Sequence, residues 1–188
     1  DGADAGEAIE AYTKALEESG HLQAFHNDYQ QRKHGNFAEA SYPSVVPDDL
    51  FADIWIGDRS ARWIDEIPGD LPWHLFVSFV GPHDPFDPPQ RLAEKYASRE
   101  MPASIHDELA DKPAWLRTFQ HYAPLAEPEV VKARRHYCAA IEAIDEAVGQ
   151  ILDALERKGQ RENTVIIFSS DHGESLGDHG LWEKQVAY

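Results

Sequence analysis

The sequence predicts an α/β domain in which helices flank a mainly parallel sheet. Two short apolar runs, 73–80 and 164–170, have the length and the β-branched and aromatic composition of strands buried on both faces. An amphipathic helix is predicted over 129–158, directly before the second run. A strand, a helix and a second strand in this order are typical of layered α/β domains.

Two helices are predicted before the first strand. Residues 4–19 repeat apolar side chains on one helical face, and Gly20 is a natural stop. Residues 53–67 repeat isoleucine in the same way and end before Pro68. Between these helices, residues 21–48 are polar and rich in histidine and are predicted to form a loop.

The middle of the chain is predicted to be irregular, and the helix that follows it is the most regular element. Residues 84–128 hold much of the proline, so we expect a long loop with short helices around 90–97 and 107–120. The helix over 129–158 is entered at Pro128 and left at Gly159. Its predicted apolar face consists of Tyr137, Ile141, Ile144, Val148, Ile151 and Leu155.

Composition bounds the possible partners. The chain has 188 residues, enough for one domain with a core, and a net charge of -17. Because phosphate binding needs a basic patch, nucleic acid is not an expected partner. No apolar run approaches transmembrane length, so no membrane segment is expected. Its one cysteine, Cys138, excludes an intrachain disulfide. Oligomeric state and compartment, whether cytoplasm or periplasm, are not indicated.

Both predicted strands end in clusters of ionisable residues, at 81–89 and at 170–184. Ligands of open α/β sheets bind at the carboxyl ends of strands. In the second cluster, Asp171 and His172 offer an adjacent carboxylate and imidazole, which suit one divalent cation. The alternative is that Asp171 caps the next turn and His172 is a bystander.

Three segments, in order, carry a resemblance to a known family. The sequence SDHGE at 170–174, followed by LGDHGLWEK at 176–184, resembles the metal-binding segment of formylglycine sulfatases and of their relatives, the phosphonate monoester hydrolases. The sequence FVSFVGPHDPFDPP at 76–89 resembles a second segment of that family, and the helix at 137–155 resembles the helix between them. The resemblance is to the alkaline-phosphatase superfamily, and it is loose over residues 1–70.

The resemblance implies roles for four residues. Asp171 and His172 match two ligands of a divalent metal, which would be calcium, with manganese as the alternative. His83 matches the histidine that contacts the sulfate and helps to protonate the leaving oxygen, and Lys184 matches the lysine that binds an ester oxygen. Without the resemblance, His83 reads as a loop histidine and Lys184 as a solvated lysine. His179, with its neighbour Asp178, is expected to orient the turn or the ligands.

The nucleophile implied by the family is a formylglycine made from cysteine in a Cys-x-Pro-x-Arg stretch, and no such stretch is present. Cys138 precedes two alanines within the predicted helix and is interpreted as structural. An acidic pair that would supply two further metal ligands is also missing. We therefore interpret residues 1–188 as the central segment of a sulfatase catalytic domain. Its alkaline-phosphatase-like fold would be incomplete, with the N-terminal nucleophile part, including the formylglycine, and the C-terminal part absent. The isolated fragment is predicted to be inactive.

The complete protein is predicted to be a metal-dependent sulfatase that hydrolyses small-molecule sulfate esters. The nearest alternative is a phosphonate monoester or phosphodiester hydrolase of the same superfamily. A phosphatase or phosphoglycerate mutase is more distant, because the block at 81–89 does not suit it. A sulfatase-like binding protein without catalysis is the alternative from another class. Aromatic residues could line a pocket for the alcohol half, although aromatics are more often core: Phe86, Trp115, Tyr122 and Trp182.

Overall fold

The computed structural model describes residues 5–69, 71–120 and 125–184. Within these ranges the regular elements are helices, and no β-strand is formed. In chain order they are α1 (Ala5–Glu18), α2 (Leu22–Arg32), α3 (Phe37–Ala40), η1 (Asp48–Leu50), α4 (Ala52–Glu66), α5 (Gln90–Tyr96), α6 (Ala114–Gln120), α7 (Glu127–Arg157), η2 (Arg161–Asn163) and η3 (Asp178–Gly180).

The helices α1, α4, α5 and α7 confirm four predicted helices to within two residues at each end, apart from Asp4, which lies outside the described residues. The helix predicted around 107–120 is shorter, because α6 begins at Ala114. The prediction of a loop over 21–48 was wrong, since α2 and α3 lie within it.

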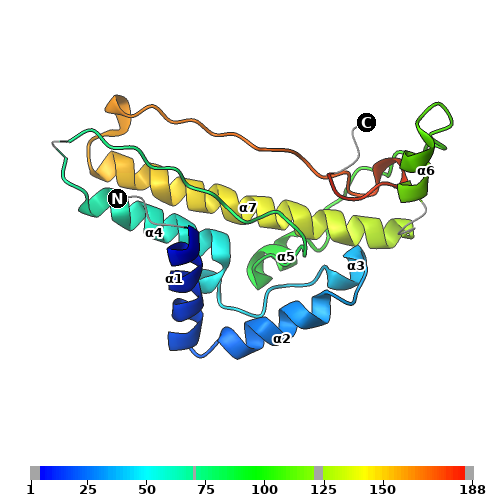
Figure 1. Cartoon of the computed structure of the whole chain (residues 1–188), viewed down its shortest axis with the longest axis horizontal. Helices are drawn as coiled ribbons and strands as arrows, with labels where there is room; N and C mark the ends of the chain where they lie inside the picture. The colour runs from blue at the N-terminus through cyan, green and yellow to red at the C-terminus, as the bar shows by residue number, and fades with distance from the viewer. Residues whose placement is uncertain (1–4, 70, 121–124, 185–188) are drawn as a thin grey trace.

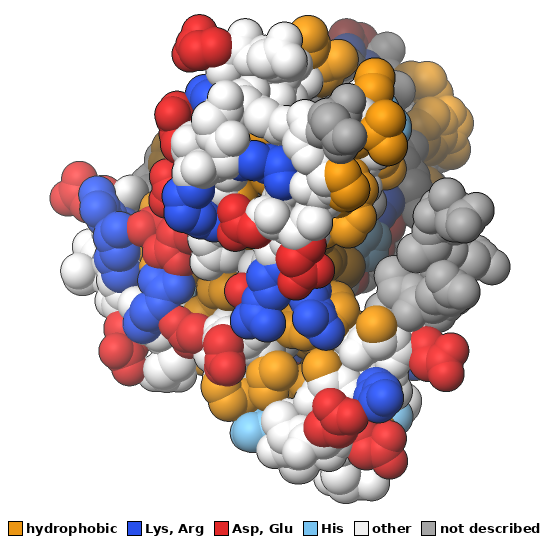
Figure 2. Space-filling view, turned by 90° about the vertical axis from the view of Figure 1, so that its left-hand side faces the viewer, with side chains coloured by type: hydrophobic (Ala, Val, Ile, Leu, Met, Phe, Trp, Pro, Cys, Tyr) orange, Lys and Arg blue, Asp and Glu red, His pale blue; other side chains and the backbone are white. Residues whose placement is uncertain are grey.

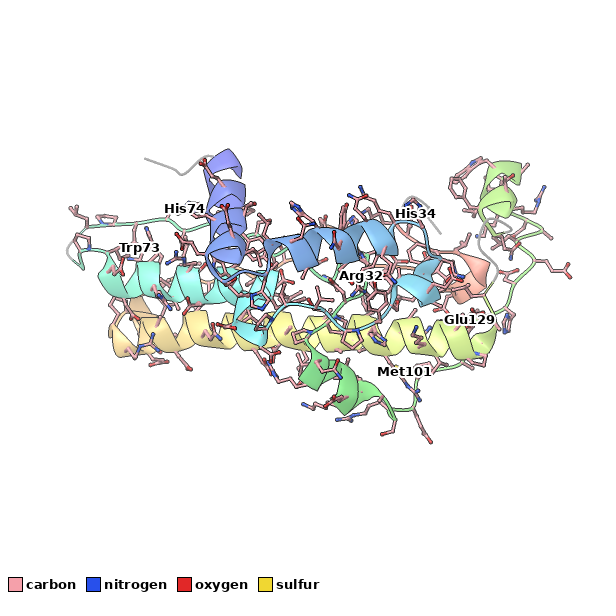
Figure 3. The ribbon with its side chains drawn as sticks, turned by 90° about the horizontal axis from the view of Figure 1, so that it is seen from below. Arg32, His34, Trp73, His74, Met101 and Glu129 are labelled. Carbon is pink, nitrogen blue, oxygen red and sulfur yellow. The ribbon has the colours of Figure 1, made fainter. Side chains whose placement is uncertain are left out.

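A buried arginine explains why a polar segment is ordered into α2 and α3. The Arg32 side chain donates to Asp28 within α2 and to the carbonyl oxygens of Ala40, Tyr42 and Pro43 beyond it. Figure 3 shows Arg32 between α2 and the chain that follows. Apolar periodicity in the sequence does not indicate a helix that is anchored by a buried cation.

The centre of the molecule is the pair of helices α4 and α7, which pack side by side and run in the same direction (Figure 1). The two helices approach so closely that a Cβ placed on Gly57 would lie 2.6 Å from the Cβ of Ala147. The face of α7 that is fully buried consists largely of alanine, including Ala139, Ala143 and Ala154. Small side chains at a helix crossing let the backbones come together.

The two predicted strands are extended but unpaired, so the parallel sheet is not confirmed. Residues 73–80 follow α4 and residues 164–170 follow α7, and both run in the same direction along the helix pair (Figure 1). The expectation of burial on both faces was wrong for this chain. Phe76 is 81% exposed, Val165 88% and Ile167 86%. The reason is physical: a strand needs a neighbour for its N–H and C=O groups, and the described residues supply none.

Charged side chains of both signs are interspersed on the face that looks onto the C-terminal ends of α4 and α7 (Figure 2). There Arg157 pairs with Asp65 at 2.8 Å, and Lys158 donates to the carbonyl oxygen of Ile67 at 2.6 Å. These contacts join the ends of the two helices. Among the described residues, no helix is both long enough and apolar enough to cross a membrane.

Candidate functional site

The structure brings the four predicted site residues to one place. A hollow of about 190 Å³ is lined by residues of 172–175 together with Glu183 and Lys184. His172 and Lys184 therefore share its wall, Asp171 adjoins His172, and His83 contacts Lys184. A larger hollow of about 580 Å³ lies beside residues 106–110 and contains none of the four. We place the candidate site at the smaller hollow, because the four side chains predicted to carry the chemistry meet beside it.

His83 and Lys184 form a direct contact between the two loops. The Nδ1 atom of His83 lies 2.9 Å from the carbonyl oxygen of Asp84, which assigns the ring proton to Nδ1. The lone pair of Nε2 then accepts from the Lys184 ammonium, with Nζ and Nε2 2.5 Å apart. This arrangement places a proton donor and its acceptor together beside the hollow.

Asp171 and His172 form a compact pair of donor atoms. The Nδ1 atom of His172 lies 2.8 Å from the carbonyl oxygen of Gly173, so its proton is assigned to Nδ1 and its Nε2 atom is unprotonated. That Nε2 atom lies 3.3 Å from a carboxylate oxygen of Asp171. Two acceptor atoms this close repel unless a proton or a cation lies near both. The two atoms can therefore be offered together to a proton or to a divalent cation. Among the described residues, no cluster of three or more acidic, histidine or cysteine side chains could hold a metal.

Glu174 closes the loop that ends in Lys184. One carboxylate oxygen of Glu174 accepts from the backbone N–H of Glu183 at 2.5 Å and from that of Leu176 at 3.3 Å. Ser175 adds a second link, because its hydroxyl donates to the carbonyl oxygen of Glu183. Burial raises the pKa of Glu174, and the two N–H groups partly offset this effect. The segment that precedes Lys184 is thus fastened back onto the segment that follows His172.

A buried arginine of α7 anchors the loop between His172 and Lys184. The guanidinium of Arg134 donates to the carbonyl oxygens of Leu176 and Pro102 and to the carboxylate of Asp178 at 2.6 Å. Asp178 also accepts from the N–H of Ile105. Burial tends to raise the pKa of Asp178, but the Ile105 N–H and the Arg134 guanidinium together hold it below its usual range.

The turn at η3 contains His179, whose φ of 57° is left-handed. Its backbone N–H donates to the carbonyl oxygen of Ile105, which ties this turn to the loop before α6. Asp178 and His179 therefore join the turn at η3 to Ile105 in the loop before α6, and Asp178 also joins it to Arg134 of α7.

An aromatic core supports the two loops and accounts for two of the predicted pocket aromatics. Trp182 stacks on Phe37 of α3 with ring centroids 4.7 Å apart, and Phe86 packs against Phe37 and Tyr137. Phe86 and Trp182 are buried core residues. Trp115 is half exposed on α6, and Tyr122 lies outside the described residues.

Cys138 lies in α7 and is partly buried. Burial raises the pKa of its thiol, and Arg134 opposes this effect. A raised thiol pKa lowers the thiolate fraction, so the environment of Cys138 is that of a structural residue.

A model of the sulfatase family matches residues 14–188. This chain belongs to the sulfatase family. It is 31% identical over 160 residues to the multifunctional alkaline phosphatase superfamily protein PehA of Trinickia caryophylli, a match that covers 76% of this chain and 31% of the relative. It is 28% identical over 152 residues to an arylsulfatase of Clostridium perfringens, covering 79% of this chain and 32% of that protein. It is 35% identical over 121 residues to the choline-sulfatase of Rhizobium meliloti, covering 60% of this chain and 23% of that protein. This sulfatase chain therefore spans a third or less of the length of these relatives.

The fold of the sulfatase chain has a counterpart among solved structures. It matches the phosphonate monoester hydrolase of Agrobacterium radiobacter with a TM-score of 0.80 and 24% identity, covering 95% of this chain and 39% of that chain. The arrangement of α1 to α7 and the extended segments is therefore that of one part of an alkaline-phosphatase-like fold.

Three residues that support the site were not predicted from the sequence: Arg134 and Glu174, described above, and Asp53, whose carboxylate accepts from the N–H groups of Val80 and Gly81 at the start of the His83 loop. Arg134 falls between Val130 and Tyr137 on the buried side of α7, and a lone cation on such a face is the signal that was available. Asp53 gives the same kind of signal, because it is an acidic residue in the first turn of α4 between the buried Phe51 and Ile54.

Proposed function

We propose that the complete protein is a metal-dependent hydrolase of sulfate esters and that this chain supplies the half of the site that assists the leaving group. The observation that carries the proposal is the contact between Nζ of Lys184 and Nε2 of His83. An ester bond to sulfur breaks faster when a cation binds an ester oxygen and an acid protonates the departing alkoxide. Membership of the sulfatase family and the names of the arylsulfatase and choline-sulfatase relatives support this reaction class.

The roles proposed for Lys184 and His83 follow from the assignment of the His83 ring proton to Nδ1. Lys184 carries positive charge toward an ester oxygen, and His83 and Lys184 share a proton that can be given to the leaving oxygen. Asp171 and His172 would hold a divalent cation, calcium by preference or manganese, together with ligands from outside this chain. When bound, such a cation supplies positive charge for the ester oxygens and activates the nucleophile. The nucleophile is proposed to be a formylglycine, also outside this chain.

We also propose that 73–80 and 164–170 become paired strands in the complete protein. Their exposed apolar side chains, including Phe76, Val165 and Ile167, are the observation that supports this. Burying such surface is favourable, and unpaired backbone groups need partners. Residues 1–188 would then be the central segment of the catalytic domain, and the chain alone would be inactive.

A phosphonate monoester or phosphodiester hydrolase is the second candidate, because the Lys184 and His83 pair suits a phosphorus ester equally well. The word multifunctional in the name of the PehA relative supports keeping this candidate. A binding protein of the sulfatase type without catalysis is the third candidate. In that case neither ester would be turned over.

The test uses the complete protein on matched aryl sulfates and aryl phosphonate monoesters. A preference for the sulfate in kcat/KM supports the sulfatase, and a preference for the phosphonate supports the second candidate. His83→Ala and Lys184→Ala should each lower the preferred activity by roughly a hundredfold or more. The surface variants His34→Ala and Lys14→Ala are the matched controls and should leave it unchanged. Turnover of neither ester by the metal-loaded protein would contradict the proposal.

A further inference from the structure

The carboxylate of Asp53 holds the start of the loop that carries His83. Asp53 is the second residue of α4 and is 1% exposed. One of its oxygens accepts from the N–H of Val80 at 2.7 Å, and both oxygens lie 3.1 Å from the nitrogen of Gly81. Hydrogen bonds to a charged acceptor are stronger than those between neutral groups. The last two amides before the Pro82 and His83 turn are therefore fixed to the helix.

The fit between Asp53 and Gly81 leaves no room for movement toward the helix. A Cβ placed on Gly81 would lie 2.3 Å from Oδ2 of Asp53 and 3.5 Å from Cδ1 of Ile144 on α7. A methyl group at this position requires the loop or the carboxylate to shift. Gly81 is two residues from His83, so such a shift moves the imidazole.

Burying a carboxylate is unfavourable unless strong partners replace water. Burial raises the pKa of Asp53, and the hydrogen bonds from Gly81 and Val80 oppose this effect. A position in the first turn of α4 also favours the negative charge, because the helix dipole is positive there. An apolar residue would fill this position at a lower desolvation cost, so the carboxylate is explained by the two amides that it holds.

We infer that Asp53 is a positioning residue for His83: it fixes where the loop that begins at Gly81 lies against the start of α4, and so where the imidazole meets Lys184 and the leaving oxygen. This inference rests on the proposed role of His83 as the group that assists departure of the alcohol. Asp53 acts only through the loop.

The experiment compares variants of the complete protein on aryl sulfates, or phosphonates if these are preferred, whose phenols range from strongly to weakly acidic. Weakly acidic phenols are poor leaving groups and need the acid. In Asp53→Asn the amide oxygen can keep the bonds in the Oδ1 place, but the NH2 group then opposes the Gly81 N–H in the Oδ2 place and the negative charge is gone, so the hold on Gly81 weakens. We expect kcat for poor leaving groups to fall by roughly tenfold to a hundredfold, while good leaving groups lose less than about threefold and KM changes little.

Gly81→Ala tests the same contact from the loop side and remains informative if Asp53→Asn folds poorly. We expect the same dependence on the leaving group. The single variant Asp53→Ala and the double variant Asp53→Ala with Gly81→Ala complete a cycle. In the double variant the methyl group gains the space of the carboxylate, so the combined loss should be smaller than the product of the losses of Asp53→Ala and Gly81→Ala. Asp58→Asn, in an exposed i,i+4 pair of the same helix, is the matched control.

An equal loss for all leaving groups, or no loss, in an active protein would overturn the inference and leave the proposed function standing. A wild-type protein that turns over neither ester would refute the proposed function, and the inference with it.

Discussion

Lys184 donates a hydrogen bond to His83 across 101 residues of sequence, with Nζ and Nε2 2.5 Å apart. The loop of His83 follows an extended segment that leaves α4, and the loop of Lys184 follows one that leaves α7. Because α4 and α7 pack side by side and run in the same direction, the two extended segments return together and the two loops arrive at the same end of the molecule (Figure 1). The contact is thus a consequence of the helix pair as well as of the two loop sequences.

Asp171→Asn and His172→Asn should each weaken the binding of a divalent metal by the complete protein. Each removes one of two donor atoms that lie 3.3 Å apart, and loss of a ligand is expected to cost roughly tenfold or more in affinity. The measurement is the metal content per protein after dialysis, by elemental analysis. The control is Asp153→Asn, an exposed position on α7. Full metal content in both site variants would contradict the assignment of this pair.

Arg134→Met should lower the free energy of unfolding by about 2–4 kcal/mol, because two backbone carbonyls and Asp178 lose a buried donor. Denaturant unfolding of the complete protein measures this change. Arg135→Met is the matched control. The Arg135 side chain donates one exposed hydrogen bond, to the carbonyl oxygen of Arg99, so the change in the free energy of unfolding should stay within about 0.5 kcal/mol. Equal stability of the two variants would show that Arg134 does not anchor the loop.

Asp87 makes stability depend on pH. Burial raises its pKa from 3.8 to about 7, although Arg32 opposes the shift. The folded protein therefore binds more protons than the unfolded chain between these two values, and stability falls as the pH rises through this window. Asp87→Asn should stabilise the protein at pH 8 by roughly 1–3 kcal/mol, and this gain should shrink as the pH falls and vanish near pH 4. Thermal unfolding across the pH range, with exposed Asp49→Asn as control, measures it. A gain independent of pH would contradict this prediction.

The helices were predictable wherever apolar residues repeat with a helical period. The apolar face from Tyr137 to Leu155, with Pro128 before it and Gly159 after it, predicted α7 to within two residues at each end. Ile151 and Leu155 of the predicted face do pack against α4. The alanines that complete this contact, such as Ala143 and Ala147, were not predicted, because periodicity gives alanine little weight. α2 was missed because Arg32 anchors it through a buried cation.

For the extended segments 73–80 and 164–170, the sequence predicted more burial than the structure shows. Their composition indicated buried strands, and 73–80 does place Trp73 and Leu75 against the helix pair. Phe76 and Ile167 are exposed, because burial of a strand depends on neighbours that a local sequence pattern does not contain. Motifs identified the candidate site residues, whereas the buried charges of Asp53 and Arg134 that support them needed three-dimensional contacts.

The most direct test of the account is a double-mutant cycle on His83 and Lys184 in the complete protein, with kcat/KM for an aryl ester of the preferred class as the readout. If the two side chains share one proton at the leaving oxygen, either alanine variant removes most of the benefit. The double variant should then be at least roughly tenfold more active than the product of the single losses predicts, a coupling of about 1.4 kcal/mol. Losses that multiply independently would mean that the two residues do not act as a pair, and the central claim would be wrong.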